Sequence, residues 1–324
     1  MKGDFSRLTF NPAKAFTQVL RQQGRVDLDA DWNEQQAILN FLDRTTRRDI
    51  IGPAGAPIDN AGFAVTLPGG NLRIGAGHFY VQGQFVDLAE DTDFDAQPYS
   101  AELPSFLDSD GNPVDSPPAG RYLFYLETWD YHVTAVEEPD LREPALGAGG
   151  PDTTTRVKTV WRVRALRLDD AGSSAHCETV TPAWTALVTP PDGMLAAQAR
   201  NVPPSTNLCA LPESAGYQSL DHRHYFVEIH DPASPGPATW KWSRDNAAFV
   251  ARWLARNGNE LTVSTTGFDA HIGFRNGGWV ELTSDTRELA GLPGTLVRVD
   301  RVAGDILEAV SYTHLTLPTT IELC

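Results

Sequence analysis

Short apolar runs, interrupted throughout by glycine and proline, set the narrowest limit on how this chain can fold. Its 324 residues include 27 Gly and 23 Pro. The runs between them are rich in Val, Tyr, Phe and Trp, which is typical of strands joined by turns. Strong runs of this kind cover 121–129 and 159–168, and glycines punctuate a hairpin-like stretch at 72–86. The sequence therefore predicts a mainly β fold built from β-sandwich or barrel-like subdomains.

One segment departs from this pattern and predicts a single N-terminal α-helix over about residues 32–48. Asp31 is placed to cap it, Glu34 has the spacing of a reciprocal capping-box carboxylate, and Gly52 follows its end. Before it, residues 25–31 alternate polar and apolar with a period of two. That alternation predicts a half-buried strand or an extended arm.

Composition shifts predict four regions and a foreign tail. The tail, 310–324, begins VSYTHLTLPT, which is a continuous translation of a transposase adapter used in DNA sequencing, so we expect natural sequence to stop near residue 309. The four regions are an N-terminal arm and helix (1–60), a β subdomain (61–168), a Pro-rich irregular connector (169–215) and a second β subdomain (216–309).

Charge and hydropathy argue against several classes of partner. The chain carries 42 Asp+Glu against 26 Lys+Arg, a net charge of -16, and has no dense basic stretch, which argues against a nucleic-acid partner. It has no apolar run long enough for membrane insertion. A Sec signal needs an uninterrupted apolar stretch near the N-terminus, and here that stretch contains Lys2, Asp4 and Arg7. We therefore expect cytoplasmic synthesis without a Sec signal.

Alternating histidines form a candidate metal site. On a strand, His222, His224, Glu228 and His230 would face one side, and the first three have the donor types of a facial metal triad. Their spacing comes close to the first motif of the cupins. The cupins' second motif is missing, so the favoured alternative is a surface strand without a ligand.

Two other sets of residues leave alternatives open. Asp27, Asp29 and Asp31 would share one face of an extended segment, as calcium ligands or as a solvated face with a helix cap. Cys177 and Cys209 are spaced either for a disulfide or as two ordinary thiols. No complete catalytic set and no cofactor motif is recognised, which favours a protein that is not an enzyme.

Four tryptophans also have two interpretations. They could form an aromatic platform for a surface glycan, or they could pack in the core, which the alternation of Trp240 with Trp242 favours. The set comprises Trp240, Trp242, Trp253 and Trp279.

Several blocks taken together resemble a bacterial family of unknown function. Met1–Phe5 reads MKGDF, Gln22–Glu34 reads QQGRVDLDADWNE, Gly75–Gly83 carries GxGxxYVxG, and Lys241–Asn246 reads KWSRDN. The resemblance is seen over nearly all of residues 1–309. Members of that family stand alone or precede right-handed β-helix regions, and some accompany phage-tail-like contractile injection systems.

The resemblance implies a non-enzymatic structural or adaptor module of such a particle, with other protein subunits as partners and release from the cell within the particle. A glycan-binding or glycan-cleaving surface protein and a cupin-like metal protein are the alternatives. We expect a specific contact in the QQGRVDLDADWNE block. If that block instead makes only intramolecular contacts, Arg25 would pair with an aspartate and Trp32 would be buried. The candidate contact residues are Gln22, Gln23, Arg25, Asp27, Asp29, Asp31 and Trp32.

Overall fold

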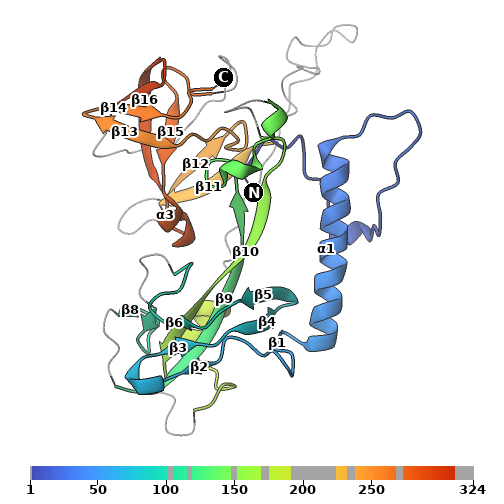
Figure 1. Cartoon of the computed structure of the whole chain (residues 1–324), viewed down its shortest axis with the longest axis vertical. Coiled ribbons are helices and arrows are strands. Elements are labelled where there is room, and N and C mark those ends of the chain that lie inside the picture. Colours follow the sequence, from blue (N-terminus) through green and yellow to red (C-terminus); the bar gives the residue numbers. More distant parts are fainter. Residues whose placement is uncertain are drawn as a thin grey trace, which may run out of the picture.

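The computed structural model confirms a mainly β protein with one long helix beside it (Figure 1). The long helix is α1, Asp29–Ile51, and two short helices are α2, Pro182–Val188, and α3, Asp285–Leu289. The structure describes residues 2–100, 105–114, 119–146, 152–168, 175–190, 224–231, 238–267 and 273–310.

Three sheets come from the N-terminal half of the chain. Their strand orders are β1-β4-β5, β2-β3-β6 and β8-β7-β10-β9. The strands are β1 Ala54–Gly55, β2 Val65–Thr66, β3 Arg73–Ile74, β4 Gly77–Val81, β5 Gln84–Leu88, β6 Thr92–Asp93, β7 Phe106–Leu107, β8 Pro113–Val114, β9 Tyr122–Val133 and β10 Arg156–Arg167.

Two further sheets come from the C-terminal half. They are the hairpin β11-β12 and a five-stranded sheet of order β13-β14-β17-β16-β15. The strands are β11 Phe226–Asp231, β12 Thr239–Ser243, β13 Trp253–Asn257, β14 Glu260–Val263, β15 Trp279–Leu282, β16 Thr295–Ala303 and β17 Ile306–Val310.

The β9–β10 ribbon extends from the N-terminal sheets to the level of the C-terminal ones (Figure 1). Its strands pair antiparallel in unbroken register from Tyr122↔Arg167 to Val133↔Arg156. Because side chains alternate along a strand, one face of β10 directs Trp161, Val163 and Ala165 into the main core. On its other face, Leu166 packs with Leu107 and with Ala183 of α2.

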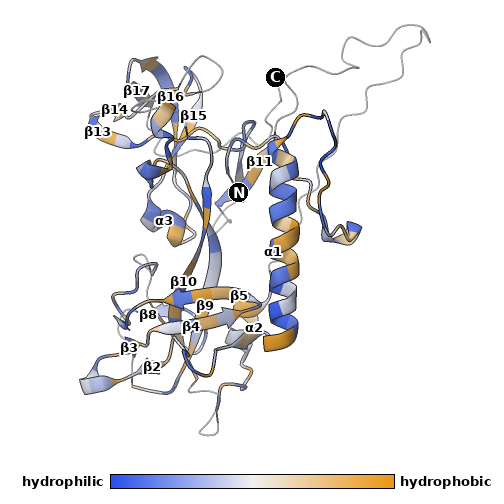
Figure 2. Ribbon diagram, turned by 45° about the vertical axis from the view of Figure 1, so that its right-hand side comes forward, coloured by the Kyte–Doolittle hydropathy of each residue, from blue (hydrophilic) through white to orange (hydrophobic). Residues whose placement is uncertain are grey.

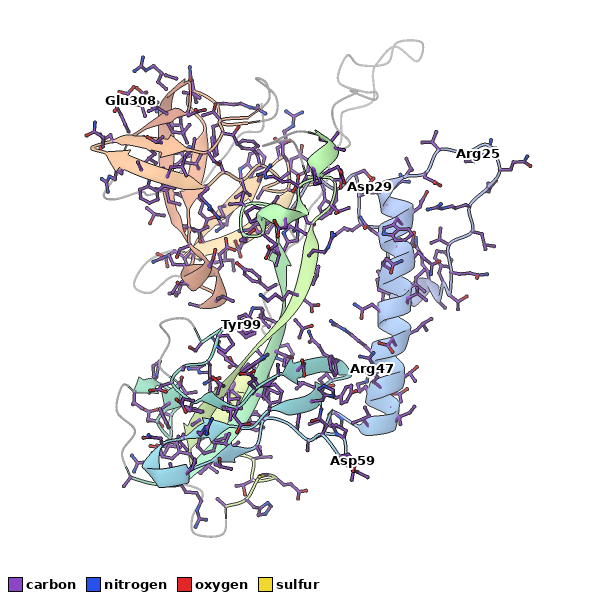
Figure 3. All side chains as sticks on the ribbon, in the orientation of Figure 1. Arg25, Asp29, Arg47, Asp59, Tyr99 and Glu308 are labelled. Carbon is purple, nitrogen blue, oxygen red and sulfur yellow. The ribbon has the colours of Figure 1, made fainter. Side chains whose placement is uncertain are left out.

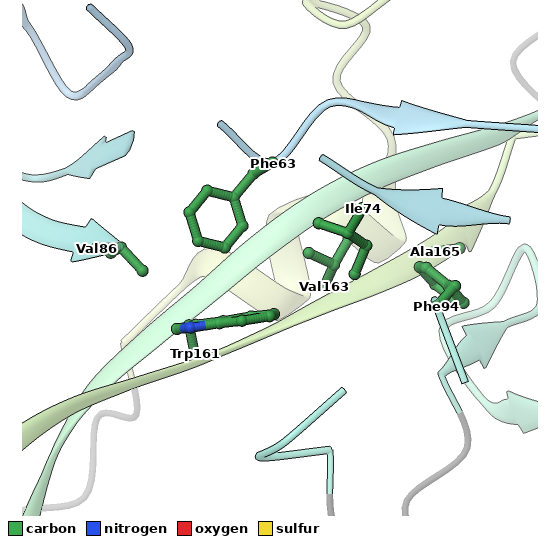
Figure 4. Close-up of a cluster of buried hydrophobic side chains, with 7 residues drawn as sticks. All are labelled: Phe63, Ile74, Val86, Phe94, Trp161, Val163 and Ala165. Atoms are coloured by element: carbon green, nitrogen blue, oxygen red, sulfur yellow. The ribbon is translucent and has the colours of Figure 1, made fainter. Parts of the chain in front are cut away.

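The two halves have separate hydrophobic cores. The first lies where the three N-terminal sheets meet (Figure 4), and its buried members are Phe63, Ile74, Val86, Phe94, Trp161, Val163 and Ala165. The second lies in the five-stranded sheet and contains Leu261, Val263, Val297, Val299, Leu307 and Ala309. Burial of this apolar surface is the main driving force for each half. The four proposed region boundaries stay a prediction.

The long helix begins earlier than the sequence predicts. Its first residue is Asp29, and its N-cap is Leu28, which makes no side-chain cap hydrogen bond. The predicted cap at Asp31 and the extended arm reaching residue 31 are therefore wrong. Asp29 and Asp31 instead lie in the first helical turn, where their charge is favourable to the helix dipole.

Helix α2 lies within the segment predicted to be an irregular connector. Thr181 caps it, accepting a hydrogen bond from the backbone N–H of Trp184 at 3.1 Å, and Pro182 occupies its first position. Threonine followed by proline is a recognised helix start, so the sequence did carry a signal for this helix.

The glycines of the GxGxxYVxG block act as predicted, in a tight turn and at a close backbone approach. Gln82 and Gly83 connect β4 to β5 with φ of 50° and 77°, the left-handed geometry of a two-residue hairpin turn. At Gly77, a Cβ would stand 2.7 Å from the carbonyl oxygen of Asn60. Only glycine fits there without displacing the neighbouring backbone.

Within the described ranges, no helix combines the length and the apolar character needed to cross a bilayer.

Candidate functional site

The N-terminal arm, residues 6–28, is fastened to the start of α1. Ser6 donates hydrogen bonds to Asp29 from its backbone N–H (2.9 Å) and its hydroxyl (2.6 Å). Burial works against the charge of Asp29, but the bonds from Ser6 outweigh it and hold the pKa of this carboxyl below its usual value. The residue that directly follows the MKGDF block is therefore joined to Asp29 of the QQGRVDLDADWNE block.

Further contacts carry the arm along one side of the helix. The Thr9 hydroxyl donates to Glu34 Oε2 at 2.7 Å, and the Val19 N–H donates to Gln35 Oε1 at 2.7 Å. The rings of Phe10 and Phe41 lie 5.7 Å apart between centroids. Glu34 thus binds the arm and does not form the reciprocal bond of a capping box, so the predicted capping box is wrong.

A second side of α1 meets the β body. Arg44 donates to both carboxylate oxygens of Asp130, at 3.1 and 3.0 Å. Gln84 of β5 donates to the same carboxylate at 2.8 Å and to the Thr159 hydroxyl at 3.2 Å. The Asp130 carboxylate of β9 therefore connects the helix to β5, and Gln84 extends the network to β10.

A third side of α1 carries apolar side chains and faces solvent. Trp32, Leu39 and Ile50 are 58%, 51% and 79% exposed. At about 100° of rotation per residue, these three positions fall within about 20° of one line along the helix. Figure 2 shows apolar segments along α1, which stands beside the β body. We call Trp32, Leu39 and Ile50 the free stripe.

The predicted contact residues divide between arm and helix. Gln22, Gln23, Arg25 and Asp27 are exposed in the arm, and Figure 3 places Arg25 at its outer end, beyond Asp29. Asp27 forms an ion pair at 3.1 Å with Arg21. Asp31 and Trp32 lie in the first turn of α1, and Trp32 is exposed, so the alternative that buried it is wrong.

The first residues of the chain are bonded to the KWSRDN block, more than 240 residues away. The Gly3 N–H donates to the Asn246 carbonyl at 3.0 Å, and Asn246 Nδ2 donates to the Gly3 carbonyl at 2.9 Å. Asn246 is 3% exposed and has a φ of 52°, a left-handed conformation that asparagine tolerates better than most residues. No sequence signal indicated this pairing.

Beside this junction lies a cavity of about 730 Å³ between the β11–β12 hairpin and the five-stranded sheet. Trp242, Trp253 and Trp279 line it, while Trp240 does not. Trp240, Trp253 and Trp279 are 46%, 47% and 45% exposed, so the preferred core interpretation of these three was wrong. We call this cavity the aromatic cleft.

A lysine and two glutamates form an ion-pair network beside the cleft. Lys241 Nζ contacts Glu228 Oε2 at 3.0 Å and also bonds to Glu281, whose Oε1 accepts the Gly294 N–H at 2.7 Å. Burial disfavours the charged forms of both Lys241 and Glu281. Their mutual bond nevertheless raises the pKa of Lys241 and lowers the pKa of Glu281. The pair is therefore charged at neutral pH.

Glu288 of α3 also lines the cleft. Its pKa is raised, whereas that of Glu281 is lowered. Burial raises the pKa of its carboxyl, the negative charges of Glu137, Asp285 and Glu281 add to the effect, and Lys2 opposes it. Glu281 and Glu288 carry no sequence signal of this site, because nothing in their local pattern places them beside tryptophans of other strands.

We expect Glu288→Gln to increase the free energy of unfolding at about pH 7. A pKa raised by folding means that the ionised carboxylate destabilises the native state. This penalty disappears as pH falls through the folded-state pKa to below the ordinary value of 4.5. Urea denaturation should therefore show a difference at about pH 7 that shrinks near pH 4. The exposed Glu260→Gln is the control, and an equal difference at both pH values would contradict the prediction.

The proposed metal and disulfide sites are only partly described. His222 and Cys209 lie outside the described residues. Glu228 is bonded to Lys241, and Cys177 is exposed. Within the described part of the chain, no group of three or more His, Cys, Asp or Glu side chains is arranged to hold a metal ion.

Comparison with protein families assigns the chain. The sequence model of DUF6519, a family of unknown function, matches residues 1–189. The chain belongs to this family. The DUF6519 match ends just after α2, whereas the motif resemblance extended to residue 309. No curated protein and no solved structure matches the chain.

The DUF6519 region thus comprises the arm, α1, strands β1 to β10 and α2. The KWSRDN block and most of the lining of the aromatic cleft lie beyond it, but Lys2, Val136 and Glu137 of the lining lie within it. Because Gly3 bonds to Asn246, the start of the DUF6519 region packs against a part of the chain that the family match does not cover.

Proposed function

We propose that this protein is a non-enzymatic structural or adaptor module of a phage-tail-like contractile injection particle, carried within the particle when it is released. The observation that supports an assembly role is the free stripe on α1. Large apolar side chains aligned on one exposed side of a helix are candidates for contacts with other molecules.

The geometry of α1 suits a contact with a neighbouring subunit. A helix of 23 residues is about 35 Å long at 1.5 Å per residue. The arm covers one side and the β body a second, through Arg44 and Asp130. The third side is therefore held rigidly in place, and a pre-organised surface loses less conformational entropy on binding.

The arm also exposes large apolar side chains. Phe16, Leu20 and Val26 are 54%, 74% and 82% exposed. Aromatic side chains such as those of Phe16 and Trp32 are enriched at protein interfaces. The arm and the free stripe together form the surface that we assign to the partner subunit.

The test is association with particles in the producing cell. We expect the tagged protein to sediment with tail-like particles on a density gradient, and Leu39→Glu to reduce the particle-bound fraction about tenfold, because it places a charge in an apolar interface. Ile58→Glu is the matched control, since Ile58 is 99% exposed but lies outside the helix and the arm. Absence from particles, or equal behaviour of the two variants, would refute the proposal.

A further inference from the structure

The aromatic cleft has the size and lining of a small-molecule site. Its volume of about 730 Å³ falls within the range of about 300 to 1,000 Å³ that is usual for ligand pockets. Such pockets are mainly apolar and aromatic, with a few polar groups that orient the ligand. Trp253 of β13 and Trp279 of β15 contribute indole rings, and Glu281 and Glu288 contribute carboxyl groups.

Two of the three tryptophans make contacts that orient their rings. The Trp253 indole N–H donates to the Ala255 carbonyl at 2.8 Å. Trp242 stacks on Tyr225 with centroids 6.1 Å apart and an interplanar angle of 27°. Trp253 and Trp279 each remain nearly half exposed. The cleft therefore presents indole faces that a flat apolar surface on a ligand would cover.

The charges around the cleft balance. Its lining contains five basic and five acidic side chains, and two of the pairs are Lys241 with Glu281 and Arg275 with Asp245. A highly charged ligand of either sign would meet as much repulsion as attraction. This balance favours a neutral ligand. The ten are Lys2, Lys241, Arg244, Arg252, Arg275, Glu137, Asp245, Glu281, Asp285 and Glu288.

The hydrogen-bond donors and acceptors that line the cleft restrict the class of ligand further. Carboxylates accept hydrogen bonds and ammonium groups donate them, while a hydroxyl group can do both. A sugar hydroxyl can therefore satisfy Glu288 and Lys2 in the same cleft. A proline-rich peptide, the other common ligand of aromatic grooves, offers chiefly carbonyl acceptors and would supply few donors to the Glu288 carboxyl group.

We propose that the aromatic cleft binds a neutral saccharide, with the C–H face of a sugar ring on Trp253 or Trp279 and its hydroxyls bonded to Glu288 and Lys2. Most of the site, including both tryptophans, lies beyond the DUF6519 match, although Lys2 belongs to it, and none of the lining residues is in the free stripe. It therefore stands independently of the proposed particle role.

The test begins with the purified full chain on an array of neutral and charged glycans, followed by calorimetric titration of the tightest neutral glycan. We expect Trp279→Ala and Trp253→Ala to weaken binding about tenfold or more, because each removes one stacking face. Trp240→Ala is the matched control and should leave affinity unchanged, since Trp240 is 46% exposed but outside the cleft.

A conservative variant separates lost binding from lost folding. Trp279→Phe retains an aromatic face and should keep most of the affinity, whereas Trp279→Leu fills the space without a ring and should lose it. Failure to bind any neutral glycan, or equal effects of the Trp240 and Trp279 variants, would overturn the proposal. So would binding confined to charged glycans and lost in about 0.5 M salt, or tighter binding of a proline-rich peptide in the cleft.

Discussion

Replacing Gly83 with alanine is expected to lower the free energy of unfolding by about 3 kcal/mol. A Cβ at this position would stand 2.1 Å from the carbonyl oxygen of Arg44, which belongs to the backbone of α1. A side-chain neighbour could rotate away, but a helix carbonyl cannot move without shifting the helix. The φ of 77° adds strain for any residue with a Cβ.

A second glycine separates these two causes. Gly69 has a φ of 64°, and a Cβ added there would meet nothing within 4 Å. Gly69→Ala should therefore cost only the strain of the left-handed backbone, about 1 kcal/mol. Urea denaturation of both variants measures the difference. Equal costs would show that the β4–β5 turn does not pack tightly against α1.

The Gly83 variant also bears on the assembly surface. The same turn lies beside the Arg44–Asp130 contact, which positions the helix on the β body. If the alanine shifts α1, then the free stripe shifts with it. We therefore expect Gly83→Ala to reduce particle association while the aromatic cleft, which lies on other strands, keeps its affinity for glycan.

The second large effect is expected at Gln97, where alanine should cost about 3 kcal/mol. This side chain is 5% exposed. Its Nε2 donates to the carbonyls of Phe94 (2.7 Å) and Val163 (3.0 Å), and its Oε1 accepts the Val163 N–H at 2.6 Å. Alanine would leave these three backbone groups buried without their partner, and each such loss is costly.

Two further variants check this explanation. Gln97→Glu keeps the acceptor oxygens but removes both donated bonds and buries a negative charge, so its cost should be at least as large. Gln36→Ala is the control, because Gln36 is exposed on α1 and alanine is a better helix former. Urea denaturation giving Gln97→Ala the same stability as the control would contradict the prediction.

The sequence predicted the long helix but misplaced its start, and Asp29 shows why. Asp31 followed by Glu34 has the spacing of a capping box, which is a local pattern. In the structure, Ser6 bonds to Asp29 and Thr9 bonds to Glu34. Both partners come from an arm more than 20 residues upstream, and no pattern within the helix could reveal them.

The tryptophans show a related difficulty. Alternation of Trp240 and Trp242 indicated a shared buried face, yet Trp240 is nearly half exposed while Trp242 lines the cleft. A period of two shows which side chains share a face. It does not show whether a second layer covers that face.

Local patterns were thus enough to recognise a mainly β chain, its one long helix, the turn glycines and the family, because strand alternation, helix periodicity and turn chemistry are encoded by neighbouring residues. Three-dimensional packing was needed to find which side of α1 stays uncovered, that Gly3 bonds to Asn246, and that tryptophans from separate strands meet carboxyl groups in one cleft. Each of these depends on contacts between distant segments, and side-chain burial is a property of the whole packed molecule.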